Sequence, residues 1–285
     1  MLKFYYSGAP NPTKVALFLE ESGTPYDPIP IDTRKGEQHK PEFLAINPNA
    51  KLPAIVDGDV KVFDSSAILL YLAEKTGKFL PAKTDKARGE LLSWMFFVSS
   101  GVGPYFGQSV HFRVYAPEKI SYATNRYVFE AQRHAGILDA RLAKQKYMLG
   151  DTYTIVDMNV WGWARLIPTV LGDGGWEKFP NLRRLADEIS ARPAAQKAVH
   201  SSRTTPIAVC WLRCWTAIHA VRRAFRSCLK SRKTRKVKAS ALYFFAPCQM
   251  IPEVLPSLQS TNSISRHITK GGVANVIENR TWAME

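Results

Sequence analysis

The stretch from residue 47 to residue 77 constrains the fold more than any other part of the chain. Residues 54–57 and 61–63 are short extended segments, and Asp57-Gly58-Asp59 lies between them. An Asp-Gly pair between two such segments is a strong signal for a hairpin turn. The sequence therefore predicts a pair of antiparallel strands here.

A helix is predicted directly after this hairpin. Apolar residues recur at helical spacing from Ala67 onward, and Gly77 supplies the left-handed residue that commonly ends a helix. Asp64 or Ser65 is expected to cap the first turn. Such a helix start presents free N–H groups and the positive end of a dipole, so it suits the carboxylate of a small anionic peptide.

Leu52-Pro53 precedes the hairpin and offers a second element of a peptide site. A cis bond is accessible before proline, and it would turn the chain sharply and leave the N–H and C=O of Leu52 free to pair with an extended ligand. A plain tight turn at the same dipeptide is the alternative.

The length and composition are those of an ordinary folded protein. With 285 residues, 46% of them hydrophobic and 22% charged, the chain is long enough for two domains or for one domain with an appendage. No apolar run reaches the roughly 18 residues that span a bilayer, and the N-terminus lacks the pattern of a signal peptide. A cytoplasmic location is therefore expected.

The net charge of +15 belongs mostly to one end of the chain. Residues 1–200 contain 25 basic and 21 acidic residues, whereas residues 201–285 contain 14 and 3, together with all four cysteines. Apolar residues from 207 to 229 follow a helical period, which is typical of a basic amphipathic helix on an anionic membrane or in a partner's groove. The abrupt change in composition favours the other interpretation, frame slippage or a retained intron.

Residues 1–80 carry strand and helix signals in a thioredoxin-like order. A β-type run at 2–6 is followed by a helix that Gly23 closes, and residues 26–31 contain two prolines that restrict them to an edge strand. A short helix at 41–46 then leads to the hairpin and the capped helix. The order β-α-β-α-β-β-α results.

Three segments carry a family resemblance: SGAPNPTKVALFLEE, KGEQHKPEFLAINPNAKLPAIVD and FDSSAILLYLAEKTGKFLP. They resemble the N-terminal domain of cytosolic glutathione S-transferases. GVGPYFGQSVHF, RYVFEAQRH, YMLGDTYTIVDM and FPNLRRL extend the resemblance, to about Val199, with the Nu-class-like bacterial and fungal group. The resemblance implies an α/β thioredoxin-like, glutathione-binding domain over residues 1–80 and an all-α C-terminal domain over residues 86–200, before an atypical basic tail at 201–285.

The residues themselves also indicate helices in this second part. A stripe from Leu91 to Val98 is apolar at helical spacing, and a long helix is predicted at 117–143. Thr154 and Asp157 form a capping box at the start of a helix with two tryptophans. We interpret that helix as structural.

The resemblance implies a site for glutathione. Ser65 and helix N–H groups would take the γ-glutamyl carboxylate, and Asp64 would pair with the γ-glutamyl ammonium. Four further positions match glutathione contacts of the family, namely Gln38, Lys51, Leu52 and Pro53. The first two would lie near the glycine carboxylate, and the leucine would pair with the cysteinyl backbone.

Catalysis requires a thiolate, because a thiol with a pKa of about 8.5 is mostly protonated at neutral pH. Asn11 matches the family's sulfur-binding position and is expected to donate its amide N–H to the sulfur, at the N-terminus of the first helix. Such a donor is worth roughly 10² to 10³ in rate. Nu-like members carry a hydroxyl where this chain has Ala9, so Ser7 is the candidate substitute, with loop capping as its alternative role.

Any redox work would use the sulfur of glutathione, because no cysteine precedes Cys210 and the first domain has no CxxC dithiol. The resemblance implies the same, since Nu-like transferases bind two glutathiones and act on disulfides. Arg133 matches the position that holds the second glutathione, and a surface pair with Glu130 or Asp139 is the alternative.

Three functions remain open: a dimeric glutathione transferase with disulfide reductase activity, a glutathione-binding module with little turnover, and a membrane adaptor acting through the tail. Membrane contact is not favoured, and no nucleic acid partner is expected. The six histidines match no metal-binding spacing, so no metal is expected, and His111 and His134 are predicted to lie in the core or between domains. The electrophile or disulfide is not identified, because its pocket would use helical-domain side chains such as Phe97, Tyr105 and Phe112.

Overall fold

The computed structural model describes residues 1–203, with side chains through residue 200. The predicted amphipathic helix at 207–229, and the rest of the basic tail beyond residue 203, lie outside the described residues.

The N-terminal part contains a mixed sheet of four strands in the order β2-β1-β3-β4. The central strand β1 (Leu2–Tyr6) runs parallel to β2 (Tyr26–Pro30) and antiparallel to β3 (Ala54–Asp57), and β3 pairs with β4 (Val60–Phe63). The predicted hairpin and the predicted edge position of the proline-containing strand are both confirmed. The predicted thioredoxin-like fold is therefore present.

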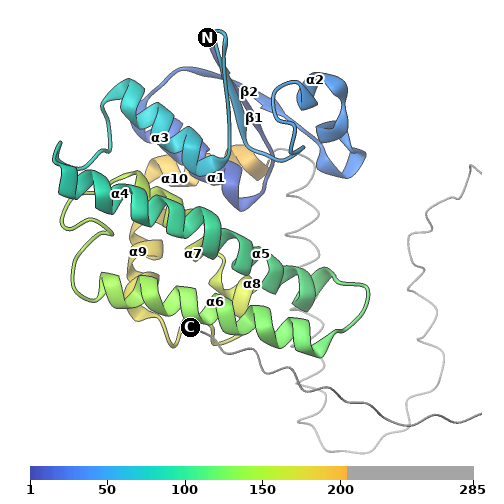
Figure 1. The fold of residues 1–285 in the computed structure, drawn as a ribbon, viewed down its shortest axis with the longest axis vertical. Coiled ribbons are helices and arrows are strands. Elements are labelled where there is room, and N and C mark those ends of the chain that lie inside the picture. Colours follow the sequence, from blue (N-terminus) through green and yellow to red (C-terminus); the bar gives the residue numbers. More distant parts are fainter. Residues whose placement is uncertain (204–285) are drawn as a thin grey trace, which may run out of the picture. The chain divides into compact units, whose positions relative to one another are not determined.

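Two helices lie between this sheet and the helices of residues 85–203 (Figure 1). They are α1 (Pro10–Ser22) and α3 (Ser65–Thr76), and each ends at a glycine with φ 67°, Gly23 and Gly77. The connection between β2 and β3 contains three short helices: η1 (Thr33–Lys35), η2 (Glu37–His39) and α2 (Pro41–Leu44). Both glycines stop their helices as predicted, because the left-handed conformation is open to a residue without a Cβ.

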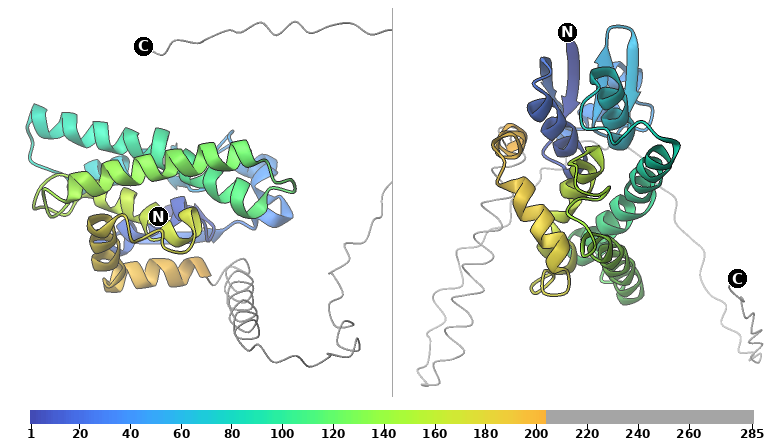
Figure 2. Two further views of the ribbon diagram at one scale, coloured as in Figure 1. Left: turned by 90° about the horizontal axis from the view of Figure 1, so that it is seen from below. Right: turned by 90° about the vertical axis from the view of Figure 1, so that its left-hand side faces the viewer.

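The remaining described residues are helical, as Figures 1 and 2 show. The elements are α4 (Asp85–Phe97), the π-helical η3 (Val98–Val102), α5 (Gly103–Val110), the π-helical η4 (His111–Tyr115), α6 (Ser121–Leu142), α7 (Ile155–Ala164), α8 (Ile167–Leu171), α9 (Pro180–Ser190) and α10 (Pro193–Arg203). The long helix predicted at 117–143 is confirmed, with a later start at Ser121. The last helix continues past residue 200, where the sequence predicted a boundary.

Helix α7 forms the centre of the helical part, and all ten of its residues are buried. Its predicted capping box is confirmed: Thr154 N donates to Asp157 Oδ2 at 2.8 Å, and Val156 N donates to Thr154 Oγ1 at 3.3 Å. Asp157 Oδ1 also accepts from Met148 N at 2.8 Å. Burial nevertheless raises the pKa of Asp157 to about 6, against the effect of these hydrogen bonds.

The two parts of the chain pack through α1. This helix contacts α3 on its own side and α7 and α10 of the helical part. Gly162 of α7 lies against Lys14, because a Cβ at residue 162 would come within 2.3 Å of Lys14 Cγ. Two ion pairs reach the other end of α1: Arg192, directly before α10, pairs with Glu21, and Lys197 of α10 pairs with Glu20. Glycine at position 162 thus leaves room for the Lys14 side chain between α1 and α7.

The two histidines predicted to lie inside the protein differ. His134 is 3% exposed and packs between the rings of Phe97 and Tyr105, as predicted. His111 is exposed, and that prediction was wrong, because α5 passes into η4 at this residue and η4 has no buried residue.

None of the helices in residues 1–203 combines the length and the apolar character that crossing a bilayer would require.

Candidate functional site

Asn11 lies in the first turn of α1, and its amide is held by the other part of the chain. Trp163 Nε1 of α7 donates a hydrogen bond to Asn11 Oδ1 at 3.0 Å. An indole N–H can only donate, so its partner must be the carbonyl oxygen of the amide, which settles which way the amide points. The NH₂ group of Asn11 is consequently left to donate elsewhere.

The start of α1 has few backbone donors. Pro10 and Pro12 have no N–H, and Thr13 N already donates to Ala9 O at 3.3 Å. In this turn Asn11 therefore offers two donors to a ligand, its backbone N–H and its side-chain NH₂. Ala9 occupies the N-cap position, where it makes no side-chain cap.

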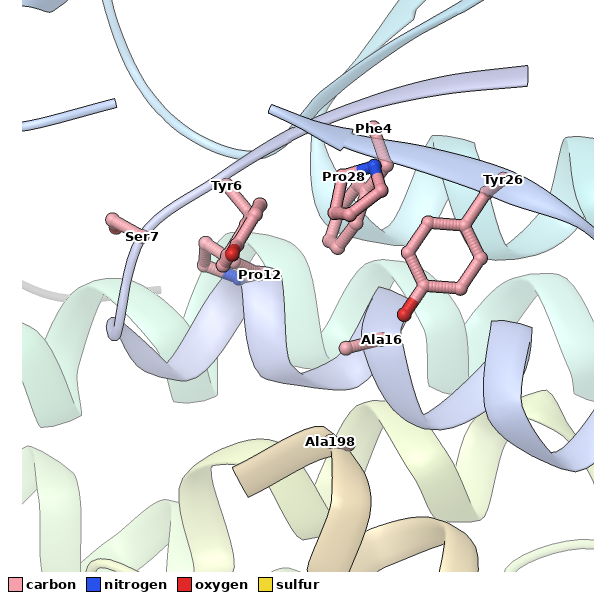
Figure 3. Close-up of a pocket in the computed structure, with 8 residues that line it drawn as sticks. All are labelled: Phe4, Tyr6, Ser7, Pro12, Ala16, Tyr26, Pro28 and Ala198. Atoms are coloured by element: carbon pink, nitrogen blue, oxygen red, sulfur yellow. The ribbon is translucent and has the colours of Figure 1, made fainter. Parts of the chain in front are cut away.

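Ser7 and Tyr6 are the hydroxyl residues next to this turn. Ser7 is buried, and it lines a small cavity together with Phe4, Tyr6, Pro12, Ala16, Tyr26, Pro28 and Ala198 (Figure 3). The cavity has a volume of about 10 Å³, which suits about one water and excludes a tripeptide. Burial raises the pKa of Tyr6, whose ring stacks on Phe4. No hydrogen bond joins Ser7 to Asn11 in the described residues, so a catalytic role of Ser7 rests on its position alone.

The start of α3 is capped by Asp64, one of the two predicted caps. Asp64 has φ 72°, and its Oδ1 accepts from Ser66 N at 2.8 Å and from Ala67 N at 3.1 Å. Ser65 is buried, and its N–H is not engaged by Asp64. The Ser65 N–H and hydroxyl are thus the groups of this turn that suit an incoming carboxylate.

Two buried side chains from α1 and α7 contact the serines of this turn. Lys14 Nζ lies 3.5 Å from Ser65 Oγ, and Asn159 Nδ2 of α7 donates to Ser66 Oγ at 2.9 Å. Lys14 is almost completely buried, which lowers its pKa to about 7 although the charge of Asp64 acts in the opposite direction. Lys14 follows Asn11 by about one helical turn, so the backbones of these two residues lie roughly 5 Å apart along the axis of α1.

The peptide bond between Leu52 and Pro53 is cis, as the sequence suggested. The preceding loop is held by Asn47, whose Nδ2 donates to Lys51 O at 2.6 Å and whose Oδ1 accepts from Asn49 N at 3.0 Å. The Lys51 side chain is exposed. Within residues 1–203, neither backbone polar group of Leu52 has a hydrogen-bond partner, so both are available to an extended ligand.

Gln38 lies in η2, after the edge strand. Its Oε1 is buried and has no hydrogen-bond partner in residues 1–203. The unpaired Oε1 could accept a hydrogen bond from a peptide N–H of the ligand. A carboxylate of the ligand could instead accept one from the NH₂ group of the Gln38 side chain. The orientation of this amide therefore decides whether Gln38 faces a peptide N–H or a carboxylate.

Arg133 lies on α6 and pairs with Glu130, the first of its two predicted surface partners. Arg133 Nε is 2.9 Å from Glu130 Oε2, and Arg126 contacts the same carboxylate. The hydrogen bond from Arg126 is the largest cause that lowers the pKa of Glu130. Asp139 has another role, since it accepts from Asn181 N at 2.8 Å. Two arginines around one glutamate leave a positive charge that suits an anion, which is compatible with the predicted second site.

The three aromatic residues expected in the second-substrate pocket belong to one cluster of rings. Phe97 and Tyr105 contact the His134 ring at centroid distances of 5.1 and 4.8 Å, and Phe112 stacks on Tyr127 at 5.2 Å. The cluster joins α4, α5, η4 and α6. It supplies an apolar wall of the helical part.

Sequence reasoning missed the contribution of α7 to the site. We interpreted its tryptophans as structural, but Trp163 orients Asn11 and Asn159 holds Ser66. Lys14 could have been noticed, because it precedes Leu17 and Phe18 at the helical spacing of the buried face of α1. Nothing in the sequence identified the partner of Asn11.

No group of three or more His, Cys, Asp and Glu side chains that could hold a metal ion occurs in the part of the chain that the structure describes.

Comparisons with known proteins match the two parts to one family. Residues 2–74 match the model for the glutathione S-transferase N-terminal domain, and residues 110–193 match the model for the C-terminal domain. The disulfide-bond oxidoreductase YfcG of Escherichia coli is 40% identical over 206 residues, which cover 70% of this chain and 94% of that protein.

Solved structures agree with this assignment. A glutathione transferase family member from Pseudomonas fluorescens with two glutathione bound has a TM-score of 0.66 and 35% identity, over 70% of this chain and 92% of that chain. A glutathione transferase from Phanerochaete chrysosporium in complex with oxidized glutathione has a TM-score of 0.67 and 33% identity, over 71% of this chain and 96% of that chain.

Proposed function

The chain belongs to the glutathione S-transferase family, and from that premise we propose that it is a glutathione transferase that reduces small disulfides with glutathione. The observation that carries the proposal is the hydrogen bond from Trp163 to Asn11. It leaves the Asn11 NH₂ as a donor at the start of α1, where a thiolate would gain from both the amide and the helix dipole. The similarity to a disulfide-bond oxidoreductase supports the same reaction.

Each proposed contact has a matching group in the structure. The Ser65 N–H and hydroxyl bind the γ-glutamyl carboxylate, and the free Asp64 oxygen faces the ammonium. The backbone of Leu52, beside cis Pro53, pairs with the cysteinyl unit. Gln38 and Lys51 are the two remaining protein residues proposed to bind the first glutathione, and both are assigned to its glycine carboxylate.

The reaction consumes two glutathiones for each disulfide. The thiolate at Asn11 attacks one sulfur of the substrate, forms a mixed disulfide and releases the other sulfur as a thiolate that takes up a proton. The thiolate of a second glutathione then attacks the mixed disulfide, which gives oxidised glutathione and the second thiol. Arg133, with Arg126 beside the shared Glu130, is proposed to hold a carboxylate of that second glutathione.

We further propose a cytoplasmic homodimer with a glutathione-binding domain at 1–80 and a helical domain at 86–200. Support for a dimer comes from large apolar side chains that are exposed: Phe63 of β4, Phe96 of α4, and Tyr122 and Phe129 of α6. Such side chains are typical of an interface between copies.

A second candidate is a glutathione-binding protein with little turnover, which the missing hydroxyl at Ala9 favours. The experiment that separates the two measures retention on immobilised glutathione and the rate of reduction of hydroxyethyl disulfide by glutathione. Retention with turnover is the expected result. Retention without turnover would support the binding protein, and no retention would contradict both.

A further inference from the structure

Lys14 is a buried ammonium group directly beneath the proposed γ-glutamyl subsite. It lies on α1, between the sheet domain and α7, and it is 1% exposed. Its stem packs against Gly162, where any side chain would displace it. The charged end reaches the start of α3, with Nζ 3.5 Å from Ser65 Oγ.

The ammonium has too few partners for its burial. It carries three N–H donors, and in residues 1–203 Ser65 Oγ is its hydrogen-bond acceptor and no carboxylate forms an ion pair with it. An unpaired buried charge is strongly unfavourable, so proteins keep one where a ligand or a function compensates for it. The atom that Lys14 does contact belongs to the residue proposed to bind a carboxylate.

We propose that Lys14 is a positioning residue for the γ-glutamyl carboxylate: its ammonium donates to Ser65 Oγ, directs the Ser65 hydroxyl hydrogen toward the carboxylate, and is balanced by the carboxylate charge. The inference rests on the proposed function. A serine hydroxyl has one hydrogen and two lone pairs, so a donor at one lone pair leaves its hydrogen for another acceptor. Because the ligand brings the missing negative charge, binding and protonation of Lys14 favour each other.

This coupling makes binding depend on pH. Burial lowers the pKa of Lys14 to about 7 in the free protein, and a bound carboxylate raises it again. Below both pKa values Lys14 is charged in the free and bound forms, so its contribution to affinity is fully present. The contribution is lost as the pH rises from the free pKa through the bound pKa.

Other charged groups lie on the elements around α1, and Asp157 of α7, whose pKa burial raises to about 6, is bonded to Met148 and Thr154. Asp64 is the charge that acts on Lys14. The other charged or titratable side chains on or next to these elements are Tyr6 of β1, Tyr26 of β2, Glu20 and Glu21 of α1, Tyr71, Glu74 and Lys75 of α3, Asp157 and Arg165 at α7, Arg192 directly before α10, and Lys197 and His200 of α10. Most of them have partners away from Lys14: Glu74 pairs with Arg88, Lys75 with Asp57, and Lys197 with Glu20.

The test compares the wild-type protein with Lys14→Met, using S-methylglutathione as the ligand because it has no ionisable thiol. Calorimetry gives the affinity of each protein between about pH 6 and pH 8, and titration of the ligand amine cancels in the ratio. If binding raises the pKa by about one unit, wild type binds about tenfold more tightly than Lys14→Met at pH 6 and about twofold at pH 8. Near pH 7.5, the wild-type protein should also take up about half a proton at Lys14 when the ligand binds, whereas Lys14→Met has no such group to protonate.

Folding of the variant and the specificity of the effect need separate controls. An apolar side chain in place of a buried charge is usually tolerated, so thermal unfolding of Lys14→Met should occur no lower than in wild type. Lys3→Met, an exposed lysine of β1, is the matched control and should keep the wild-type pH profile.

The outcomes separate this inference from the proposed function. Wild type that fails to bind S-methylglutathione at any pH would contradict the proposed function itself. A different result would be that the wild-type protein binds S-methylglutathione with the same affinity ratio to Lys14→Met at pH 6 and pH 8, and with the same proton uptake as the variant. That result would overturn the role of Lys14 and leave the proposed function standing.

Discussion

At the scale of single residues, the site depends on hydrogen bonds that fix the direction of a side chain. Asn11 can present either end of its amide, and the indole of Trp163 occupies the oxygen end. The hydroxyl of Ser65 has the same freedom, and Lys14 occupies one of its lone pairs. In both cases a buried donor from a neighbouring helix determines what the exposed atom offers to a ligand.

Asn11→Ala should raise the pKa of the bound glutathione thiol and lower disulfide turnover by at least about tenfold, because it removes the side-chain donor to sulfur. Glutathione affinity should change less. The ultraviolet absorbance of the thiolate, followed against pH, measures the pKa. Asn125→Ala, at an exposed position of α6, is the control. Equal titration curves for Asn11→Ala and wild type would transfer the role to Ser7 or to the Asn11 N–H.

Trp163→Phe keeps the ring and removes the N–H that orients the amide. Turnover should fall, by less than in Asn11→Ala, and the double variant should be no slower than Asn11→Ala, because the two residues act through one contact. Steady-state kinetics of the four proteins form the cycle. Trp161→Phe is a matched control, since the indole of Trp161 donates to Ser190 Oγ instead. Additive losses in the double variant would show that Trp163 acts independently of Asn11.

At the scale of elements, α7 is the helix on which the site is built. Its residues Asn159, Gly162 and Trp163 contact Ser66, Lys14 and Asn11, respectively. These positions follow one another at helical spacing, so a single helix face supports both ends of the proposed glutathione site. The capping box at Thr154 and Asp157 determines where this helix begins and thus which residues face α1.

Asp157→Ala should lower the free energy of unfolding by about 3 kcal/mol, because it removes the helix cap and leaves the buried N–H of Met148 without its acceptor. Urea denaturation measures the change. Asp85→Ala provides the comparison, because Asp85 is exposed in the first turn of α4. The free energy of unfolding of this variant should fall by about 0.5 kcal/mol. Similar losses in the two variants would contradict the central role given to the α7 cap.

At the scale of the whole molecule, the described fold contains all the residues proposed for the site. The last of them in sequence, Trp163, precedes α9 and α10, and α10 packs on α1. The basic tail contains none of these residues. Its net charge of +11 is nevertheless most of the charge of the chain.

Truncation after Arg203, at the end of α10, should leave glutathione-dependent turnover unchanged and should improve solubility, because it removes the apolar stripe of the tail sequence. Kinetics and flotation with anionic vesicles, at low and high salt, check this. Flotation of the full-length protein that weakens with salt and is absent after truncation would instead support the membrane interpretation. A truncated protein that folds without turnover would show that the tail takes part in the site.

The features that could be predicted from the sequence are those that depend on near neighbours in the chain. The Asp-Gly hairpin, the glycine helix stops, the Asp64 cap and the capping box of α7 are all settled within a few residues, and each was predicted. Family resemblance supplied the glutathione residues.

The contacts that support those residues could not be predicted, because they join distant parts of the chain. Trp163 and Asn11 are 152 positions apart and Lys14 and Ser65 are 51 apart, so no local pattern joins them. They meet because α1 packs on both α3 and α7, and Gly162 leaves room for the Lys14 side chain. Burial then lowers the pKa of Lys14, since only the packed interface removes its ammonium from water.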